Sequence, residues 1–135
     1  MKQSYHILRN ASLNGTDVED LRVAVGWDRM EGLYDAILKR SYAHFSVTVA
    51  DKLIAFVNVM SDGIGDAFLV DLMVHPDHQH QGLATALVER AIEEISRDGV
   101  RCMEVIFDPR LDGFYRRFGF HIVSAGIIDR WERKE

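Results

Sequence analysis

The sequence has little cysteine and little proline: one cysteine and two prolines in 135 residues. Cys102 cannot form an intrachain disulfide, and it stands in a β-type run with no candidate base beside it, so we expect it to be a half-buried filler. Apart from Pro76 and Pro109 no stretch has the composition of an interdomain linker, and there is no internal repeat. We therefore expect one domain over residues 1–135, a size that buries roughly two thirds of the unfolded surface.

Long apolar runs and an excess of basic residues are also missing. No stretch approaches the ~20 apolar residues of a membrane span, and residues 1–10 lack the apolar centre of a signal peptide, so we expect a cytoplasmic protein without membrane contact. The net charge is −5 and the pI about 5.6, with acidic and basic residues interspersed. No basic stripe can follow a nucleic-acid backbone, so we expect no nucleic-acid partner. The net negative charge either attracts a cationic acceptor substrate or simply keeps the protein soluble.

Hydrophobic periodicity predicts the following order of elements. The first half reads as a strand at Tyr5–Leu8, a helix capped by Thr16 or Asp17, a helix at Arg29–Arg40 and an antiparallel hairpin of Ala43–Ala50 with Leu53–Met60. The second half reads as a strand at Ala67–Val74, an amphipathic helix at Gly82–Arg97 ended by Gly99, a strand starting at Val105–Phe107, a short helix after Gly113 and a strand within Ile122–Trp131. A strand, helix, strand succession of this length implies a parallel pair with a crossover.

The segment between Val74 and Ala84 joins the end of a buried strand to the start of the strongest predicted helix. The first turn of a helix has unpaired N–H groups and the positive end of the macrodipole, and Gly82 and Ala84 leave room for a phosphate. The pattern Gln-x-x-Gly-x-Ala at Gln79–Ala84 is compatible with a pyrophosphate site. A structural strand-to-helix turn is the alternative, because the pattern alone is weak.

A second cluster, Phe-Tyr-x-x-x-Gly-Phe at Phe114–Phe120, lies about thirty residues downstream. Val-x-Pro at Val74–Pro76, then Gln-x-x-Gly-x-Ala, then this cluster resembles the GNAT superfamily of acyl-CoA-dependent N-acyltransferases. The resemblance covers Ala67 to Phe120 and implies an α/β fold: a mixed, mostly antiparallel sheet with a central splayed parallel strand pair and helices on both faces. It also implies acetyl-CoA as acyl donor and no metal.

The resemblance assigns residues to the donor. The turn would hold the pyrophosphate, the strand before it would pair with the pantetheine arm, and the backbone near Met73 would stabilise the oxyanion. Asp108 stands where many members have an asparagine, and a carboxylate does not donate a hydrogen bond unless protonated. For Phe114 the alternative is aromatic packing. The expected acetyl-CoA contacts are Leu72, Met73, Val74, Gln79, His80, Gln81, Gly82, Leu83, Ala84, Thr85, Asp108 and Phe114.

Two residues are candidates for proton transfer. The resemblance makes Tyr115 the general acid, since a tyrosine stays protonated at neutral pH and can protonate the departing thiolate. Asp71 is the ionisable residue in an otherwise apolar strand, and burial would make its carboxylate a better proton acceptor. The alternative for Asp71 is a carboxylate satisfied by backbone donors, or one that binds the amine electrostatically, with water as the base.

The histidines His75, His78 and His80 cluster in sequence, but no further ligand set accompanies them, so we expect no metal. The predicted function is acetyl transfer from acetyl-CoA to the primary amine of a small molecule in a ternary complex. A route through Cys102 is disfavoured, because no activating histidine is adjacent in sequence. The alternatives are a non-catalytic acyl-CoA-binding module and an unrelated α/β domain. The apolar segment Ile122–Ile128 could supply a homodimer interface.

Overall fold

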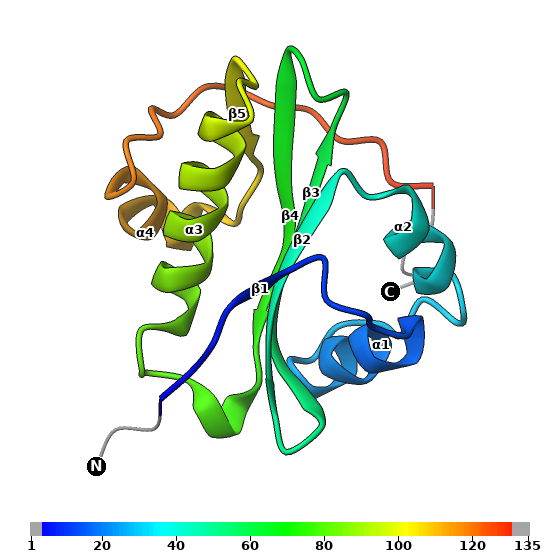
Figure 1. Ribbon diagram of the computed structural model, residues 1–135. Helices are drawn as coiled ribbons and strands as arrows, with labels where there is room; N and C mark the ends of the chain where they lie inside the picture. Colours follow the sequence, from blue (N-terminus) through cyan, green and yellow to red (C-terminus); the bar gives the residue numbers. More distant parts are fainter. Residues whose placement is uncertain (1–3, 131–135) are drawn as a thin grey trace. The chain divides into compact units, whose positions relative to one another are not determined.

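The computed structural model describes residues 4–130, with five strands in one sheet and four α-helices (Figure 1). The chain divides into two compact units, Met1–Val105 and Ile106–Glu135. The first unit holds the sheet and the helices α1, α2 and α3. The expectation of a single domain remains a prediction, and each unit is described by itself below.

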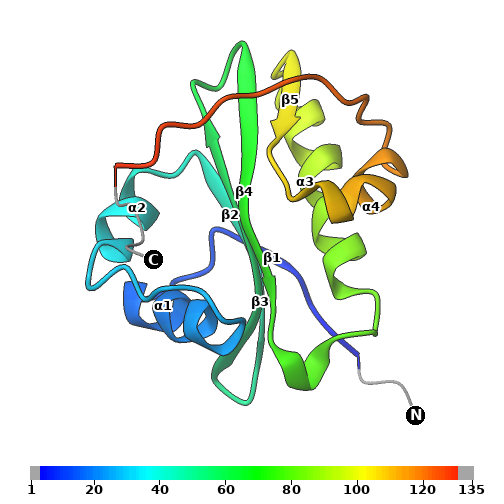
Figure 2. The ribbon, with the colours of Figure 1, turned by 180° about the vertical axis from the view of Figure 1, so that it is seen from behind.

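The sheet has the order β1-β2-β3-β4-β5. Its strands are β1 (Leu8–Arg9), β2 (Ala43–Val49), β3 (Lys52–Ser61), β4 (Asp66–Val74) and β5 (Cys102–Val105). The first three pairings are antiparallel and β4 pairs with β5 in parallel. The hairpin and the parallel pair are therefore confirmed, and Figure 2 shows β5 beside only part of β4.

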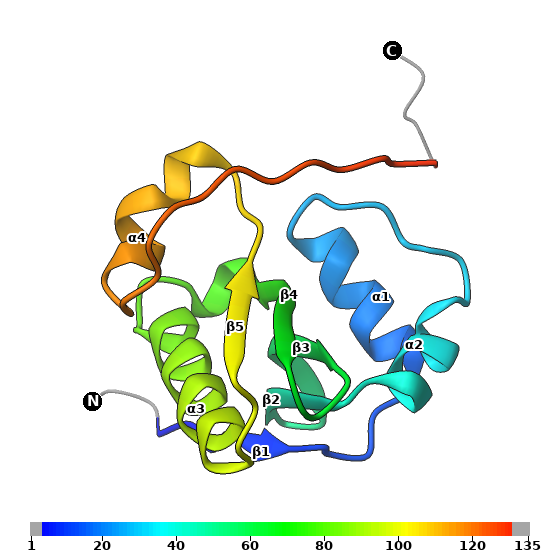
Figure 3. The ribbon, with the colours of Figure 1, turned by 90° about the horizontal axis from the view of Figure 1, so that it is seen from above.

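Helices cover both faces of the sheet. Figure 3 shows α1 (Gly15–Ala24) and α2 (Tyr34–Arg40) on one side and α3 (Leu83–Arg97) on the other, as predicted. Strands covered on both faces bury both sets of side chains, which explains the nearly continuous burial along β2 and β3. The core cluster on the α1–α2 side comprises Val18, Leu21, Tyr34, Leu53, Phe56 and Met73.

The first two helices begin at different residues from those predicted. The N-cap of α1 is Asn14, and not Thr16 or Asp17. Asp17 instead accepts a hydrogen bond from the Asn14 N–H at 3.1 Å, as the third residue of a capping box does. The second helix does not begin at Arg29 but at Tyr34, because residues 30–32 all have positive φ and cannot continue an α-helix.

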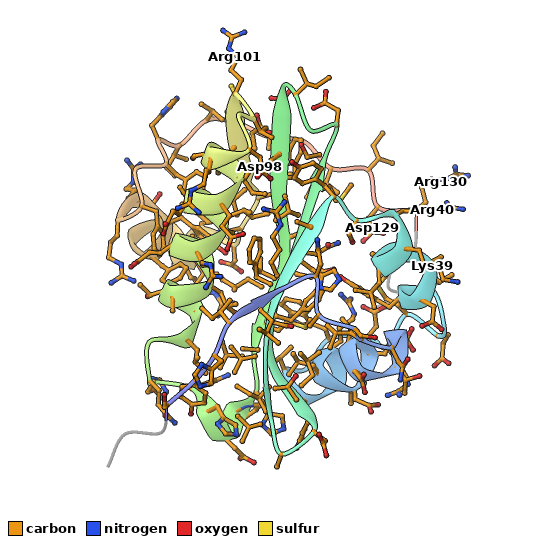
Figure 4. The ribbon with its side chains drawn as sticks, in the orientation of Figure 1. Lys39, Arg40, Asp98, Arg101, Asp129 and Arg130 are labelled. Carbon is orange, nitrogen blue, oxygen red and sulfur yellow. The ribbon has the colours of Figure 1, made fainter. Side chains whose placement is uncertain are left out.

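The long helix α3 begins and ends as predicted. Gly82 is its N-cap, and Gly99, with φ +91°, follows the C-cap Asp98. Asp98 accepts hydrogen bonds from Arg9 at 2.7 Å and from the Tyr42 hydroxyl at 2.8 Å, and so links this end of α3 to the strands (Figure 4). Lys39 and Arg40 at the end of α2 are exposed, where positive charge suits the helix dipole.

Three predictions about strands are corrected. The first strand is Leu8–Arg9 and not Tyr5–Leu8, since only these residues pair with β2. The strand after α3 is Cys102–Val105, so it ends where it was predicted to begin. No strand lies between Arg117 and Arg130, and Trp131 is outside the described residues. The parallel pair therefore lies at the edge of the described sheet instead of its centre.

The second unit contains the 3₁₀ turn η2 (Pro109–Leu111), the short helix α4 (Asp112–Arg116) and an extended segment. The predicted short helix is confirmed. In the extended segment Val123, Ile127 and Ile128 are strongly exposed. The homodimer interface proposed for this segment stays a prediction. Over residues 4–130, no helix has the length and apolar character needed to cross a membrane.

Candidate active site

The strand β4 has a free edge over its second half. Asp66 to Leu69 pair with Cys102 to Val105, and there β5 ends. Within the described residues no strand pairs with positions 70–74 on that side. The parallel pairing therefore ends at Leu69, and Leu72, Met73 and Val74 lie on the edge that an extended ligand could join. The predicted splay of the two strands stays a prediction.

A β-bulge interrupts β4 at Asp71. Phe56 pairs with Met73 and Asn58 with Val70, so Asp71 and Leu72 together face the single residue Val57. Asp71 has φ +57°, a left-handed conformation that is uncommon for a residue other than glycine. The bulge redirects the Asp71 side chain toward α1 and α2, whose residues it contacts.

The Asp71 carboxylate has two side-chain donors. Oδ2 accepts a hydrogen bond from the Tyr34 hydroxyl at 2.6 Å, and Oδ1 one from Arg22 Nη1 at 3.2 Å. Arg22 and Tyr34 reach β4 from the helices, so side chains supply these hydrogen bonds. The role of Asp71 as the base stays a prediction. About a quarter of the side chain, 27 %, remains exposed, so a ligand can still reach it.

The turn between β4 and α3 has the geometry predicted for an anion site. His80 and Gly82 have φ +64° and +80°, and Gly82 places no side chain over the first turn of the 15-residue helix. A Cβ added at Gly82 would meet no atom within 4 Å. The turn residues Gln79, His80, Gln81 and Gly82 are exposed, Ala84 and Thr85 are half-buried, and Leu83 is buried. The positive end of the helix dipole therefore lies at an open surface.

Side chains brace this turn from two sides. Gln79 Nε2 donates to the Val74 carbonyl at 3.0 Å. The Tyr5 hydroxyl donates to Gln81 Oε1 at 2.7 Å and lies 3.0 Å from His78 Nδ1. His75 Nδ1 accepts from the Asp77 N–H at 3.1 Å. The rings of His75 and His78 thus have structural partners in or beside the turn.

A hollow of about 430 Å³ lies near His75, beside α1 and the β2–β3 turn. It is lined by Asp17, Asp20, Leu21, Ala24, Asp51, Lys52, Leu53 and His75. None of the residues predicted to bind acetyl-CoA lines it. The hollow is therefore distinct from the predicted donor site.

Tyr115 lies on α4 in the second unit, where it is 5 % exposed. Its ring stacks on Phe107, with centroids 4.5 Å apart, and meets the edge of Phe114 at 4.9 Å. Burial raises the pKa of the Tyr115 hydroxyl, so it stays protonated at neutral pH as a general acid must. Phe114 also contacts Phe118 edge-on at 5.1 Å, which is aromatic packing. A role for either residue toward acetyl-CoA stays a prediction.

Asp108 precedes the 3₁₀ turn η2 in the same unit. Its Oδ1 accepts from the Arg110 N–H at 2.9 Å, and its carboxylate pairs with the Arg110 guanidinium at 3.2 Å. These bonds, from the backbone first and the side chain second, hold the pKa of Asp108 below its usual range. Asp108 is therefore an ionised acceptor. It cannot donate a hydrogen bond as an asparagine at this position could.

Cys102 is exposed, so the expectation of a half-buried residue is wrong. The reason is its position at the start of the edge strand β5, directly opposite Asp66. Its Sγ lies within 4.8 Å of ligand atoms of Asp66 and Glu104. Within the described residues, the side chains of Asp66, Cys102 and Glu104 form a group of possible metal ligands that lie close together. None of the clustered histidines belongs to this group.

Four polar residues around the site escaped the sequence analysis: Tyr5, Arg22, Tyr34 and Asn58. The helical spacing of Tyr34 with Ile37 and Leu38 predicts a core residue, which is correct for its ring but leaves out its hydroxyl. Arg22 is only 8 % exposed, and a charged residue on the apolar face next to Leu21 was the available signal. Nothing in the sequence marks Tyr5 or Asn58.

The chain matches known proteins over most of its length. Residues 41–122 match the acetyltransferase (GNAT) domain family. An uncharacterised N-acetyltransferase of the red alga Gracilaria tenuistipitata var. liui is 28 % identical over 123 residues, 87 % of this chain and 68 % of that protein. The rice chloroplastic serotonin N-acetyltransferase 2 is 31 % identical over 120 residues, 81 % of this chain. The chain spans 58 % of the length of the rice protein.

Solved structures share the fold. A GNAT-family acetyltransferase from Streptococcus pneumoniae superposes with a TM-score of 0.75 at 25 % identity, covering 98 % of this chain and all of that chain. A probable acetyltransferase from Staphylococcus aureus has a TM-score of 0.79 at 21 % identity, covering 93 % of this chain and all of that one. The mixed sheet with one parallel pair is thus an arrangement found in these proteins.

Proposed function

Because this chain belongs to the GNAT family of acetyltransferases, we propose that it transfers an acetyl group from acetyl-CoA to the primary amine of a small molecule. The observation that carries the proposal is the free edge of β4 followed in the chain by the open N-terminus of α3. An extended pantetheine arm suits the strand edge, and a pyrophosphate suits the helix end.

In the proposed reaction both substrates bind together. Residues Leu72 to Val74 pair with the pantetheine arm, and the backbone of Gln79 to Thr85 holds the pyrophosphate. The amine nitrogen attacks the thioester carbonyl, a C–N bond forms, and the C–S bond then breaks. Backbone N–H groups near Met73 stabilise the oxyanion between these events.

Two protons move in this reaction. An alkylammonium keeps its proton up to pH ~10, so a base must take one before attack. Asp71 is the proposed base, since its carboxylate is part-exposed beside the free edge of β4. Tyr115 is the proposed acid that protonates the leaving thiolate, supported by the raised pKa of its hydroxyl.

The acceptor is proposed by chemical class. A serotonin N-acetyltransferase from rice and a histone acetyltransferase from soybean are each 31 % identical to this chain over aligned regions of 120 and 126 residues. Both names imply a primary amine, carried by an arylalkylamine in one case and a protein in the other. A panel of arylalkylamines, polyamines, aminoglycosides, amino acids and a lysine peptide separates the small-molecule proposal from peptide acetylation.

Calorimetric titration with acetyl-CoA tests the donor site. Gly82→Asp and Gly82→Asn form a matched pair, because both side chains tolerate the left-handed φ of Gly82 and neither meets an atom there. Repulsion between the carboxylate and the pyrophosphate should weaken binding of Gly82→Asp by about tenfold relative to Gly82→Asn. Equal affinities would place the pyrophosphate elsewhere.

Release of CoA thiol across the amine panel then tests turnover. Binding without turnover on every amine would favour the second candidate, a non-catalytic acyl-CoA-binding module. No acetyl-CoA binding by the folded wild-type protein would overturn both.

A further inference from the structure

Tyr34 is held in place from several directions. It is the first residue of α2, and its side chain is fully buried. Its backbone N–H donates to Glu19 Oε2 at 3.2 Å, and the same oxygen accepts from the Gly32 N–H at 2.9 Å. Its ring meets Phe56 edge-on with centroids 5.9 Å apart. A residue fixed in this way can present its hydroxyl at one position only.

The hydroxyl of Tyr34 serves one acceptor. It donates to Asp71 Oδ2 at 2.6 Å. Burial first, and then the Asp71 carboxylate, raise the pKa of Tyr34 far above its ordinary value. The phenol therefore keeps its proton at every pH at which an enzyme works, and its donation to Asp71 is permanent.

The other carboxylate oxygen is held less firmly. Arg22 reaches Oδ1 at 3.2 Å, but its shorter bonds go to the Asp28 carbonyl at 2.7 Å and the Asp28 carboxylate at 3.0 Å. The Trp27 ring lies 5.4 Å from the same guanidinium. Oδ1 thus keeps a weaker and longer hydrogen bond than Oδ2, and it belongs to a side chain that is part-exposed.

We propose that Tyr34 is a positioning residue for Asp71: it fixes Oδ2, which leaves Oδ1 to take the proton of the acceptor ammonium. In this step an N–H bond of the ammonium breaks and an O–H bond forms on Oδ1, which leaves a neutral amine and a neutral carboxyl group. The inference rests on the proposed function, in which Asp71 is the base. Tyr34 does not contact the reacting atoms and acts only through Asp71. The orientation of α2 on the sheet therefore affects the reaction, because α2 holds Tyr34 in place.

The charges around Asp71 define the expected pH effect. Arg22 faces it from α1 and is itself paired with Asp28, Tyr34 faces it from α2, and Asn58 lies on β3. Glu19 accepts from the backbone of Tyr34. Removing only the Tyr34 hydroxyl leaves these charges unchanged and takes one hydrogen bond from the ionised carboxylate. The variant therefore isolates the contribution of this one hydrogen bond to the carboxylate.

The test is the pH profile of kcat/KM for the amine in Tyr34→Phe. Loss of one hydrogen bond should move the acid limb upward by about 0.5 to 1 pH unit, with acetyl-CoA affinity unchanged. Phe56→Leu is the matched control, because it loosens the packing of the Tyr34 ring and keeps the hydroxyl. It should lower Tm without moving the acid limb.

A second substitution tests the same role if the Tyr34→Phe variant does not fold. Site-specific 3-fluorotyrosine at position 34 keeps the ring and makes the phenol a stronger donor, so it should move the acid limb to lower pH. An acid limb that stays in place in both variants would overturn the positioning role.

Asp71→Asn shows whether a negative result refutes only the positioning role of Tyr34 or also the proposal that Asp71 is the base. If Asp71→Asn keeps full turnover, Asp71 is not the base, whatever the Tyr34 variants do. If Asp71→Asn lowers kcat by at least about a hundredfold, and the Tyr34 variants keep the acid limb of the wild type, only the positioning role is wrong.

Discussion

The Tyr5 hydroxyl donates a hydrogen bond to Gln81 Oε1 at 2.7 Å and thereby ties the segment before β1 to the turn before α3. The same hydroxyl lies 3.0 Å from His78 Nδ1. A hydroxyl has one proton, so the His78 ring must be the donor in that second contact. Two residues of the turn are thus held by one side chain from a distant part of the sequence.

Tyr5→Phe should weaken acetyl-CoA binding by at least about fivefold, because the turn loses the contacts of this hydroxyl with Gln81 and His78, and one such hydrogen bond is worth about 1 kcal/mol. Calorimetric titration measures this change. Tyr42→Phe is the matched control, since its hydroxyl bonds to Asp98 at the opposite end of α3. Tyr42→Phe should keep the wild-type affinity, and equal losses in both variants would point to general destabilisation instead.

Tyr115→Phe should lower kcat by about a hundredfold or more and leave the dissociation constant of acetyl-CoA unchanged. The substitution removes only the hydroxyl and keeps the ring that stacks on Phe107. Steady-state kinetics and calorimetry on the same sample give both values. Phe118→Leu is the control for packing in this unit, since Phe118 contacts Phe114 and not the Tyr115 hydroxyl. A Tyr115→Phe variant with wild-type kcat would show that another group, or water, protonates the thiolate.

Long periodic segments were predictable from the sequence. The apolar positions of α3 repeat over four turns, and the β2–β3 hairpin combines two β-type runs with a short turn, so local pattern and tertiary packing agree. The second helix was predicted five residues too long, because Met30 and Glu31 fit the helical pattern but adopt positive φ beside Gly32. The apolar pattern after Ile122 predicted a strand, yet a strand also needs a partner to pair with.

The site was predictable in its backbone and not in its side-chain contacts. The glycine at position 82 marks the turn directly, whereas the bulge at Asp71 was not predicted, because an aspartate in an apolar strand does not by itself indicate one. The partners of Asp71, however, are 49 and 37 residues away in sequence, and only the packing of α1 and α2 on the sheet brings them together. A pattern that assigns Tyr34 to the core cannot say what its hydroxyl contacts.

Cys102→Ser should keep acetyl transfer within about twofold of the wild type. The thiol is exposed, and the side chains grouped beside it are the carboxylates of Asp66 and Glu104, not an activating histidine. Activity assays measure the variant, and intact-protein mass spectrometry after incubation with acetyl-CoA alone looks for a covalent acetyl group. An acetylated Cys102 together with an inactive serine variant would replace the ternary mechanism by a ping-pong route.

His44 should make the fold sensitive to mild acid. Its side chain is 8 % exposed, its ring stacks on Phe56 with centroids 5.8 Å apart, and burial lowers its pKa below the ordinary value. The unfolded chain therefore binds a proton at His44 more readily than the folded chain, so the free energy of unfolding falls as the pH drops below about 6.5.

The slope that one histidine adds to this fall is at most about 1.4 kcal/mol per pH unit. Urea unfolding between pH 8 and pH 5.5 measures it, a range above the titration of most carboxylates. His44→Gln should flatten the dependence, whatever its stability at pH 8, while the exposed control His80→Gln should keep the wild-type slope. If the free energy of unfolding has the same pH dependence in the wild type and in His44→Gln, His44 accepts a proton as readily in the folded protein as in the unfolded chain. Water would then reach its buried position.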